Sequence, residues 1–168
     1  MKKLAIREAA PADADAVFHI TAEAFKKYAA GIEAPESVEA LKETREDVLS
    51  DIENKTVLIA CLDGEPAGSV RFRAFDSYAH VTRFGVKLMA QGYGVGRALI
   101  CEVERRCREL GLKAVLLHAS SRIHSLMRFY YDHGFFVHST TTERGYIRAL
   151  MVLELEPCNG LDYGKLLK

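Results

Sequence analysis

Apolar and polar positions along this chain of 168 residues follow two different periods. Short runs rich in β-branched and aromatic residues predict strands, because such side chains pack well on a pleated surface. Stretches with apolar residues three or four positions apart predict amphipathic helices. The predicted strands are residues 4–7, 57–62, 67–74, 78–86, 114–118, 135–140 and 147–155, and the predicted helices are residues 11–28, 36–54, 123–133 and one that ends before Gly111. The tail, residues 157–168, is too polar and glycine-broken to assign.

The helix that ends before Gly111 follows the segment Gly92–Gly96, in which every second residue is glycine. Glycine tolerates positive φ and lets a ligand come close to the main chain. The first turn of a helix presents unpaired N–H groups and a partial positive charge. The segment therefore predicts an anion-binding site, and a pyrophosphate is the expected anion. Strands 78–86 and 114–118 flank this helix, which predicts a parallel pair with a right-handed crossover.

Two common phosphate-binding motifs do not fit this segment. The dinucleotide fingerprint needs a third glycine where this chain has Arg97 or, in the later register, Leu99. The P-loop ends in Gly-Lys-Ser or Gly-Lys-Thr, and neither tripeptide occurs in the chain. The glycine segment therefore belongs to another class of pyrophosphate site.

The pattern Gln91-x-x-Gly94-x-Gly96, after a strand that ends at Val86, resembles the acetyl-CoA signature of the GNAT family of N-acetyltransferases. A second stretch, Phe129–Phe135, resembles the family's late helix with its Tyr-x-x-x-Gly-Phe ending. The opening and closing strands are also similar, at Ile6–Ala9 and Tyr146–Leu150. The resemblance spans nearly the whole chain.

This resemblance implies an α/β (α+β) fold with a mixed, mostly antiparallel central sheet of about six to seven strands, one splayed parallel pair and helices on both faces. It implies one N-acetyltransferase domain over residues 1–168. Acetyl-CoA is the expected co-substrate, with its pantetheine arm between strands 78–86 and 114–118, and no metal is expected. The residues expected to bind acetyl-CoA are Phe84, Gly85, Val86, Gln91, Gly92, Tyr93, Gly94, Val95, Gly96, Arg97 and Ala98.

Tyr130 stands at the position of the family's general acid, four residues before the Gly-Phe pair. An unperturbed phenol has a pKa of about 10, so it stays protonated at neutral pH and can donate to the leaving thiolate. The alternative is a core role, because Tyr130 shares a helical stripe with Leu126 and Phe129. Ile123 and Leu126 depart from the Asn and Ala of many members, which removes one polar contact to the pantetheine arm.

The general base is less well defined. The position that matches the family's glutamate is Thr82, and His80 lies two residues earlier on the same strand face. Histidine titrates near neutral pH, so His80 is the candidate base, acting directly or through water. The alternative is a structural hydrogen-bonding role on an otherwise apolar strand.

Other residues with reactive side chains are explained more simply. Ser120 and Ser121 lack the Gly-x-Ser-x-Gly context of a hydrolase nucleophile and are interpreted as N-cap residues of the next helix. His133 and His138 have no cysteine or acid at ligand spacing, so a metal site is not predicted. Cys61 is interpreted as a small packing residue rather than an acyl carrier.

Composition and charge narrow the class of protein. Lys plus Arg and Asp plus Glu number 23 each, so there is no basic field to attract nucleic acid. The four cysteines show no CxxC spacing, which is typical of reduced thiols in the cytoplasm. Arg7 and Glu8 follow the start too closely for a signal-peptide core, and no apolar run is long enough to span a membrane. A cytoplasmic protein is expected, with no membrane partner, and a homodimer is left open.

The acceptor is the least defined partner. Acidic residues crowd residues 33–54 and could attract a cationic amine, or could simply form a solvated helix face. The segment Ser139–Gly145 is either a loop over the acceptor or a hairpin turn. The resemblance implies direct transfer of the acetyl group of acetyl-CoA to a primary amine of a small molecule or peptide. The alternative is a non-catalytic acetyl-CoA-binding sensor or interaction module on the same fold.

Overall fold

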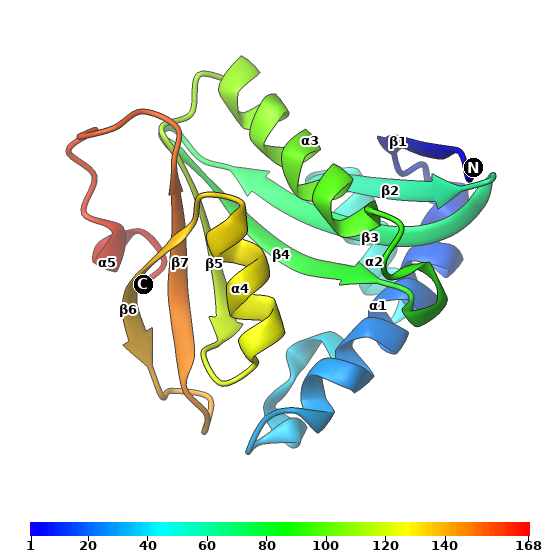
Figure 1. The fold of residues 1–168 in the computed structure, drawn as a ribbon, viewed down its shortest axis with the longest axis horizontal. Helices are drawn as coiled ribbons and strands as arrows, with labels where there is room; N and C mark the ends of the chain where they lie inside the picture. The colour runs from blue at the N-terminus through cyan, green and yellow to red at the C-terminus, as the bar shows by residue number, and fades with distance from the viewer.

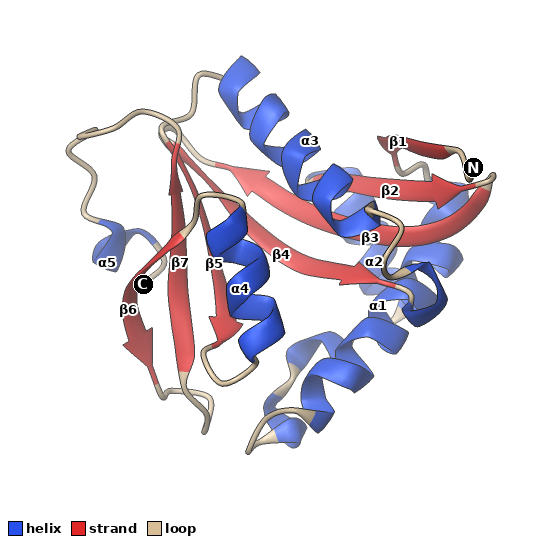
Figure 2. Ribbon diagram, viewed as in Figure 1, coloured by secondary structure: helices blue, strands red, loops and turns tan.

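The computed structural model describes residues 1–168, and its strands form one seven-stranded sheet with helices on both faces (Figures 1 and 2). The strands are β1 (Leu4–Glu8), β2 (Thr56–Leu62), β3 (Glu65–Ala74), β4 (Tyr78–Val86), β5 (Ala114–Ser120), β6 (Phe136–Thr141) and β7 (Arg148–Glu154). The helices are α1 (Ala14–Ala30), α2 (Arg45–Asn54), α3 (Val95–Glu109), α4 (His124–Asp132) and the short α5 (Tyr163–Leu166). Each predicted strand is present, within a few residues of its predicted bounds.

The strand order is β1-β2-β3-β4-β5-β7-β6, and every neighbouring pair is antiparallel except β4 and β5. The chain crosses from β4 to β5 through α3, which confirms the predicted parallel pair (Figure 1). β2 and β3 are joined by a tight turn in which Asp63 and Gly64 both have positive φ, 53° and 86°. This is the hairpin geometry that an Asp-Gly pair favours.

The helices form two layers, one on each face of the sheet, and strand glycines let them come close (Figure 2). A Cβ at Gly85 of β4 would lie 2.6 Å from the Cβ of Ala24 in α1. On the opposite face, a Cβ at Gly68 of β3 would lie 2.8 Å from Cγ1 of Val95, the first residue of α3. Both α1 and α3 therefore pack directly against a strand glycine, and the position of the α3 N-terminus depends on the absence of a side chain at Gly68.

The predicted helix over residues 36–54 is wrong in its first half. Two 3-10 turns, η2 (Pro35–Ser37) and η3 (Glu39–Leu41), precede α2, and Val38 between them is extended. Thr44 then caps α2, because its hydroxyl accepts the N–H of Asp47 while its own N–H donates to the Asp47 carboxylate. The cap prevents one continuous helix.

Two smaller findings complete the fold. Gly111, with φ 72°, follows the end of α3 as predicted, and Leu110 before it is exposed. The unassigned tail folds back along the sheet, where the Tyr78 hydroxyl donates to the carbonyl of Leu166 at 2.7 Å. None of the helices combines the length and apolar character that a bilayer crossing requires.

Candidate active site

The two parallel strands separate soon after they meet, which opens the centre of the sheet. β4 pairs with β5 only from Tyr78–His80 against Ala114–Leu116. Beyond that point Val81–Val86 and Leu117–Ala119 line opposite sides of a cleft of about 1630 Å³. Side chains of α1, α4, β6, β7, the start of α3 and the C-terminal tail complete its walls.

A bulge in β4 changes which way its residues face at the cleft. Thr82 pairs with Arg71 and Gly85 pairs with Ser69, so Arg83 and Phe84 together lie opposite one residue of β3. Arg83 has φ 52°, the left-handed conformation that such a bulge requires. The irregular pair sends Arg83 to the α2 face and Phe84 to the α4 face, where its ring stacks on Phe129 at 5.6 Å.

Beyond the bulge, the main chain of β4 divides its hydrogen-bonding groups between β3 and the cleft. The N–H of Lys87 donates to the carbonyl of Ala67 in β3 at 2.8 Å. Because strand residues alternate, the groups of Gly85 also face β3, and those of Val86 face the open gap. Of the three predicted residues of β4, Val86 thus presents its main chain to the cleft, while Gly85 packs against α1.

The glycine segment forms the predicted turn at the start of α3. Gly92 and Gly94 have φ of 83° and 78°, and Gly94 is the N-cap, with no side chain capping it. The N–H groups of the six residues Gly92–Arg97 donate to no acceptor within the protein, whereas the N–H of Ala98 donates to Gly94 at 3.0 Å. Successive free amides at a helix N-terminus favour an anion. The predicted contact of the Ala98 amide is wrong, because helix formation uses that group.

The side chains around this turn are held by α1 and the N-terminus. Gln91 accepts a hydrogen bond from Lys27 at 3.1 Å, and the Glu23 carboxylate accepts the N–H of Leu88 at 2.8 Å. The Tyr93 ring is half-exposed, with the Lys2 ammonium 4.5 Å from its centre. The turn is therefore fixed to α1 at the edge of the cleft.

Tyr130 lies in α4 with its ring buried among Phe84, Phe129 and Phe135. Its hydroxyl lines the cleft and makes no hydrogen bond within the protein. Burial raises the pKa of this phenol far above its usual value, so the group stays protonated. The arrangement joins the two sequence interpretations, since the ring belongs to the core and the hydroxyl belongs to the cleft.

His80 and His118 line the cleft on the sheet face that α1 and α5 cover. Burial is the main cause that lowers the pKa of each ring to about 4, and Lys55 and Arg148 add repulsion at His80. The predicted titration of His80 near neutral pH is therefore wrong. Both rings are neutral at pH 7, and Tyr130 approaches the cleft from the opposite face of the sheet.

Sequence reasoning missed a cluster where β7 begins. The Tyr28 hydroxyl of α1 accepts the N–H of Ser120 at 3.0 Å and lies 3.0 Å from the hydroxyl of Tyr146. Ser120 is thus not the N-cap of α4, a position that Ile123 holds without a side-chain cap. Arg148, the first residue of β7, also lines the cleft. The sequence signal that could have pointed to this cluster is Arg148, a charged residue at the start of an otherwise apolar strand.

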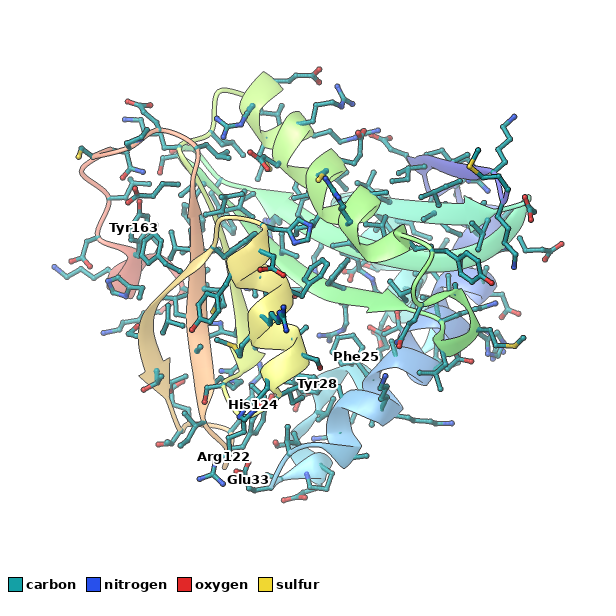
Figure 3. All side chains as sticks on the ribbon, in the orientation of Figure 1. Phe25, Tyr28, Glu33, Arg122, His124 and Tyr163 are labelled. Carbon is teal, nitrogen blue, oxygen red and sulfur yellow. The ribbon has the colours of Figure 1, made fainter.

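Most of the acidic stretch over residues 33–54 lies away from the cleft, which only Glu39 of these acids lines. Glu43 and Asp51 bind the fully buried guanidinium of Arg71, at 2.8 Å and 2.9 Å. Glu33 pairs with Arg122 at 2.7 Å, between the end of α1 and the start of α4 (Figure 3). These acids neutralise cations of the protein itself. Of the segment Ser139–Gly145, residues 139–141 belong to the end of β6 and residues 142–145 begin its connection to β7, and both parts contribute to the cleft wall.

Comparison with known proteins agrees with this geometry. The model of the Acetyltransferase (GNAT) family matches residues 15–135. The uncharacterized N-acetyltransferase YjcF of Bacillus subtilis (strain 168) is 30% identical over 91 residues, which cover 54% of this chain and 63% of that protein.

Solved structures share the fold. The PaiA N-acetyltransferase of Thermoplasma acidophilum, in complex with coenzyme A, has a TM-score of 0.81 and 22% identity over 90% of this chain and 99% of its own. YncA of Salmonella typhimurium, a putative acetyltransferase with its cofactor acetyl-CoA, has a TM-score of 0.75 and 21% identity over 92% and 95%. Since the family model covers well over half of the residues, from α1 to the end of α4, this chain belongs to the GNAT family of acetyltransferases.

Proposed function

We propose that this protein transfers the acetyl group of acetyl-CoA directly to a primary amine of a small molecule or peptide. The observation that carries the proposal is the row of six unpartnered amides, Gly92–Arg97, at the mouth of the gap between β4 and β5. Any helix leaves its first four amides unpaired, here those of Gly94–Arg97, and the turn at Gly92 and Tyr93 extends the row by two, which favours an anionic ligand. Membership of the GNAT family supports acetyl-CoA as the source of that anion. We further propose that residues 1–168 act as one catalytic domain.

Acetyl-CoA would be held along the line that these groups define. The pyrophosphate binds the amides of the α3 N-terminus, where the helix dipole adds attraction. The pantetheine arm lies between the separated strands and pairs with the main chain of Val86, which β5 leaves unpartnered. The same N–H polarises the thioester carbonyl, so the amine and the acetyl carbon meet in a fixed geometry.

Tyr130 is the proposed general acid. When the tetrahedral intermediate breaks down, the C–S bond cleaves and the sulfur leaves as a thiolate that takes the phenolic proton. The free hydroxyl at the cleft and the raised pKa both support this role, because they keep the proton present and unshared until a sulfur atom arrives.

The amine must lose a proton before or after it attacks. An aliphatic ammonium has a pKa of about 10.4, so transfer to a ring with a pKa near 4 is uphill by about 9 kcal/mol. A general-base role for His80 stays a prediction, and its low pKa favours proton loss to water in the cleft. In a His80→Gln variant, a fall in kcat of less than threefold would exclude the histidine as base, since such a group contributes about a hundredfold or more.

Release of free thiol from acetyl-CoA, measured with a panel of amines and checked by product mass, tests the function. Acetylated amine and stoichiometric coenzyme A are expected. Calorimetric binding of acetyl-CoA without turnover of any amine would support the sensor instead, and the absence of binding by folded protein would reject both functions.

A further inference from the structure

We propose that the acceptor carries a carboxylate beside its primary amine and that the guanidinium of Arg148 binds this carboxylate. The acceptor is then a compound of the amino-acid type rather than a polyamine or the side chain of a peptide lysine. This inference rests on the proposed acetyl transfer and names the acceptor class for the same cleft.

Arg148 lies beside the place where the acetyl group is expected. It pairs with Ser120 of β5 and with Thr141 of β6, so the three side chains share one face of the sheet. His118 lies on the same face, because it precedes Ser120 by two residues in β5. Paired strand residues have Cα atoms about 5 Å apart, so the base of the Arg148 side chain is one strand away from the open edge of β5.

The guanidinium of Arg148 has no partner within the protein. No carboxylate lies within 4.0 Å of it, none of its nitrogens forms a hydrogen bond, and its Nε is buried. The other arginines without an anionic partner are all exposed: Arg73, Arg97, Arg128 and Arg144. A half-buried cation without a counter-ion is costly, which indicates that its partner comes from outside the chain.

The surroundings of Arg148 are short of negative charge. Burial and the nearby Arg144 lower the pKa of its guanidinium, and Arg148 in turn repels a proton from His118. Glu143 is the one carboxylate that acts on Arg148, from beyond ion-pair distance and from an exposed position. A cationic acceptor with no acidic group would meet repulsion here, whereas an anion would be attracted.

The chemistry of the group favours a carboxylate. The planar guanidinium fork matches two carboxylate oxygens, and one cation neutralises one negative charge. The neighbouring hydroxyl that lines the cleft and could share the anion, that of Thr141, is a neutral donor, and the Ser120 side chain beneath it is fully buried. With the carboxylate on Arg148, a short acceptor places its amine at the gap between β4 and β5, while a long one would overshoot it.

Matched acceptors test this inference. The twenty L-amino acids, their carboxamides, the corresponding decarboxylated amines and a set of aminophosphonates are assayed with acetyl-CoA. We expect kcat/KM for the carboxylate to exceed that of the matched amide and amine at least tenfold. An equal or greater rate with the amides and amines would overturn the proposal, and a preference for phosphonates would replace the carboxylate by a phosphoryl group.

Arg148→Gln is the variant that assigns the contact. It should raise KM for the carboxylate acceptor at least thirtyfold, change kcat by less than threefold and leave acetyl-CoA affinity unaltered. Arg122→Gln, which removes an exposed arginine of the same end of the molecule, is the matched control and should change neither constant. An unaltered KM in Arg148→Gln would contradict the assignment.

A binding measurement separates this inference from the proposed transfer. If acetyl-CoA neither binds nor turns over, the proposed function fails, but melting temperatures with the same amino acids and amides still decide the acceptor class. Stabilisation of the wild-type protein by carboxylates, absent in Arg148→Gln, supports the inference. No carboxylate-dependent stabilisation of the wild-type protein, with no turnover of any carboxylate, rejects it.

Discussion

Two arginines on one face of the sheet, Arg71 and Arg148, show opposite uses of the same side chain. Arg71 is fully buried in β3, where its guanidinium binds Glu43, Asp51 and the hydroxyl of Thr21. It ties α1 and α2 to the first half of the sheet. Arg148 lies in the second half, beside the cleft, and binds no residue of the chain. The first arginine is part of the fold, and the second awaits a ligand.

The same contrast separates other polar groups of the molecule. The Tyr163 hydroxyl has partners in Glu154 and Asn159, whereas the Tyr130 hydroxyl has none. The amides inside α3 are paired, whereas those of Gly92–Arg97 are free. The residues that carry these free groups line the cleft, apart from Tyr93 in the middle of the turn. Partnered groups maintain the structure and unpartnered groups mark where it acts, which suggests paired substitutions that test the distinction.

Arg71→Met should produce the largest loss of stability. It leaves Glu43 and Asp51 without their buried counter-charge, and the free energy of unfolding should fall by about 3–5 kcal/mol. Urea denaturation measures the change. Arg73→Met, one pleat along in β3 and exposed, should stay within about 0.5 kcal/mol of wild type. Similar losses of stability in both variants would contradict the stabilising role of the buried ion pairs of Arg71.

Acid should weaken the cleft side of the molecule through His80 and His118. Their pKa is about 4 in the fold, because burial and nearby cations disfavour the charged ring, and about 6.5 in the unfolded chain. Between those values only the unfolded chain takes up protons, so stability is complete above pH 6.5 and is lost as the pH falls towards 4. The loss should be about 3 kcal/mol for the pair, after allowance for solvent in the cleft.

Denaturation at a series of pH values measures this dependence. The double variant His80→Gln and His118→Gln should flatten the curve between pH 4 and 6.5. His124→Gln, at an exposed ring, should leave the curve as it is. An unchanged slope in the double variant would place the acid sensitivity elsewhere.

Gly94→Val should weaken acetyl-CoA binding at least a hundredfold, which corresponds to about 2.7 kcal/mol. A β-branched side chain strains the left-handed turn and covers the amides that face the pyrophosphate. Gly111→Val at the other end of α3 imposes comparable strain, with φ 72°, and should keep the affinity. Calorimetry on both variants separates strain from lost binding, and equal affinities would contradict the role of the turn.

Tyr130→Phe should lower kcat by about tenfold to a hundredfold, because the thiolate then leaves without a proton donor. The affinity for acetyl-CoA should stay the same, since the ring still packs in the core. Tyr163→Phe should do the opposite, with a stability loss of about 1 kcal/mol from its broken hydrogen bonds and an unchanged kcat. Full activity in Tyr130→Phe would remove its acid role.

Much of the fold could be predicted because its signals are local. The β-branched runs, the Asp63–Gly64 turn and the glycines before α3 each depend on a few neighbouring residues. The family signature then supplied the separated parallel pair, which no periodicity predicts. The helix over residues 36–54 failed although its break is also local, because Thr44 and Asp47 form a capping box that starts a new helix there.

The site was predicted less completely than the fold. Tyr130 and the glycine turn lie in motifs, so their positions could be read from the chain. The pKa of His80 depends on burial and on cations from other elements, Lys55 and Arg148. The lack of a partner at Arg148 is a property of the assembled sheet, and a linear sequence does not show which charges end up alone.

The bulge at Arg83 adds one residue to β4 and breaks its strict alternation of side-chain directions. Thr82 and Gly85 both face α1 although three positions separate them, which strict alternation forbids. Deletion of Arg83 would restore strict alternation from Thr82 through Phe84 to Gly85, so Phe84 would still face α4 and Gly85 would still face α1, while the bend of the strand and the contact of Arg83 with Glu43 would be lost. The extra residue therefore gives β4 its bend and places a cation against the α2 face, and a chain shortened by Arg83 should keep the contacts of Phe84 and Gly85.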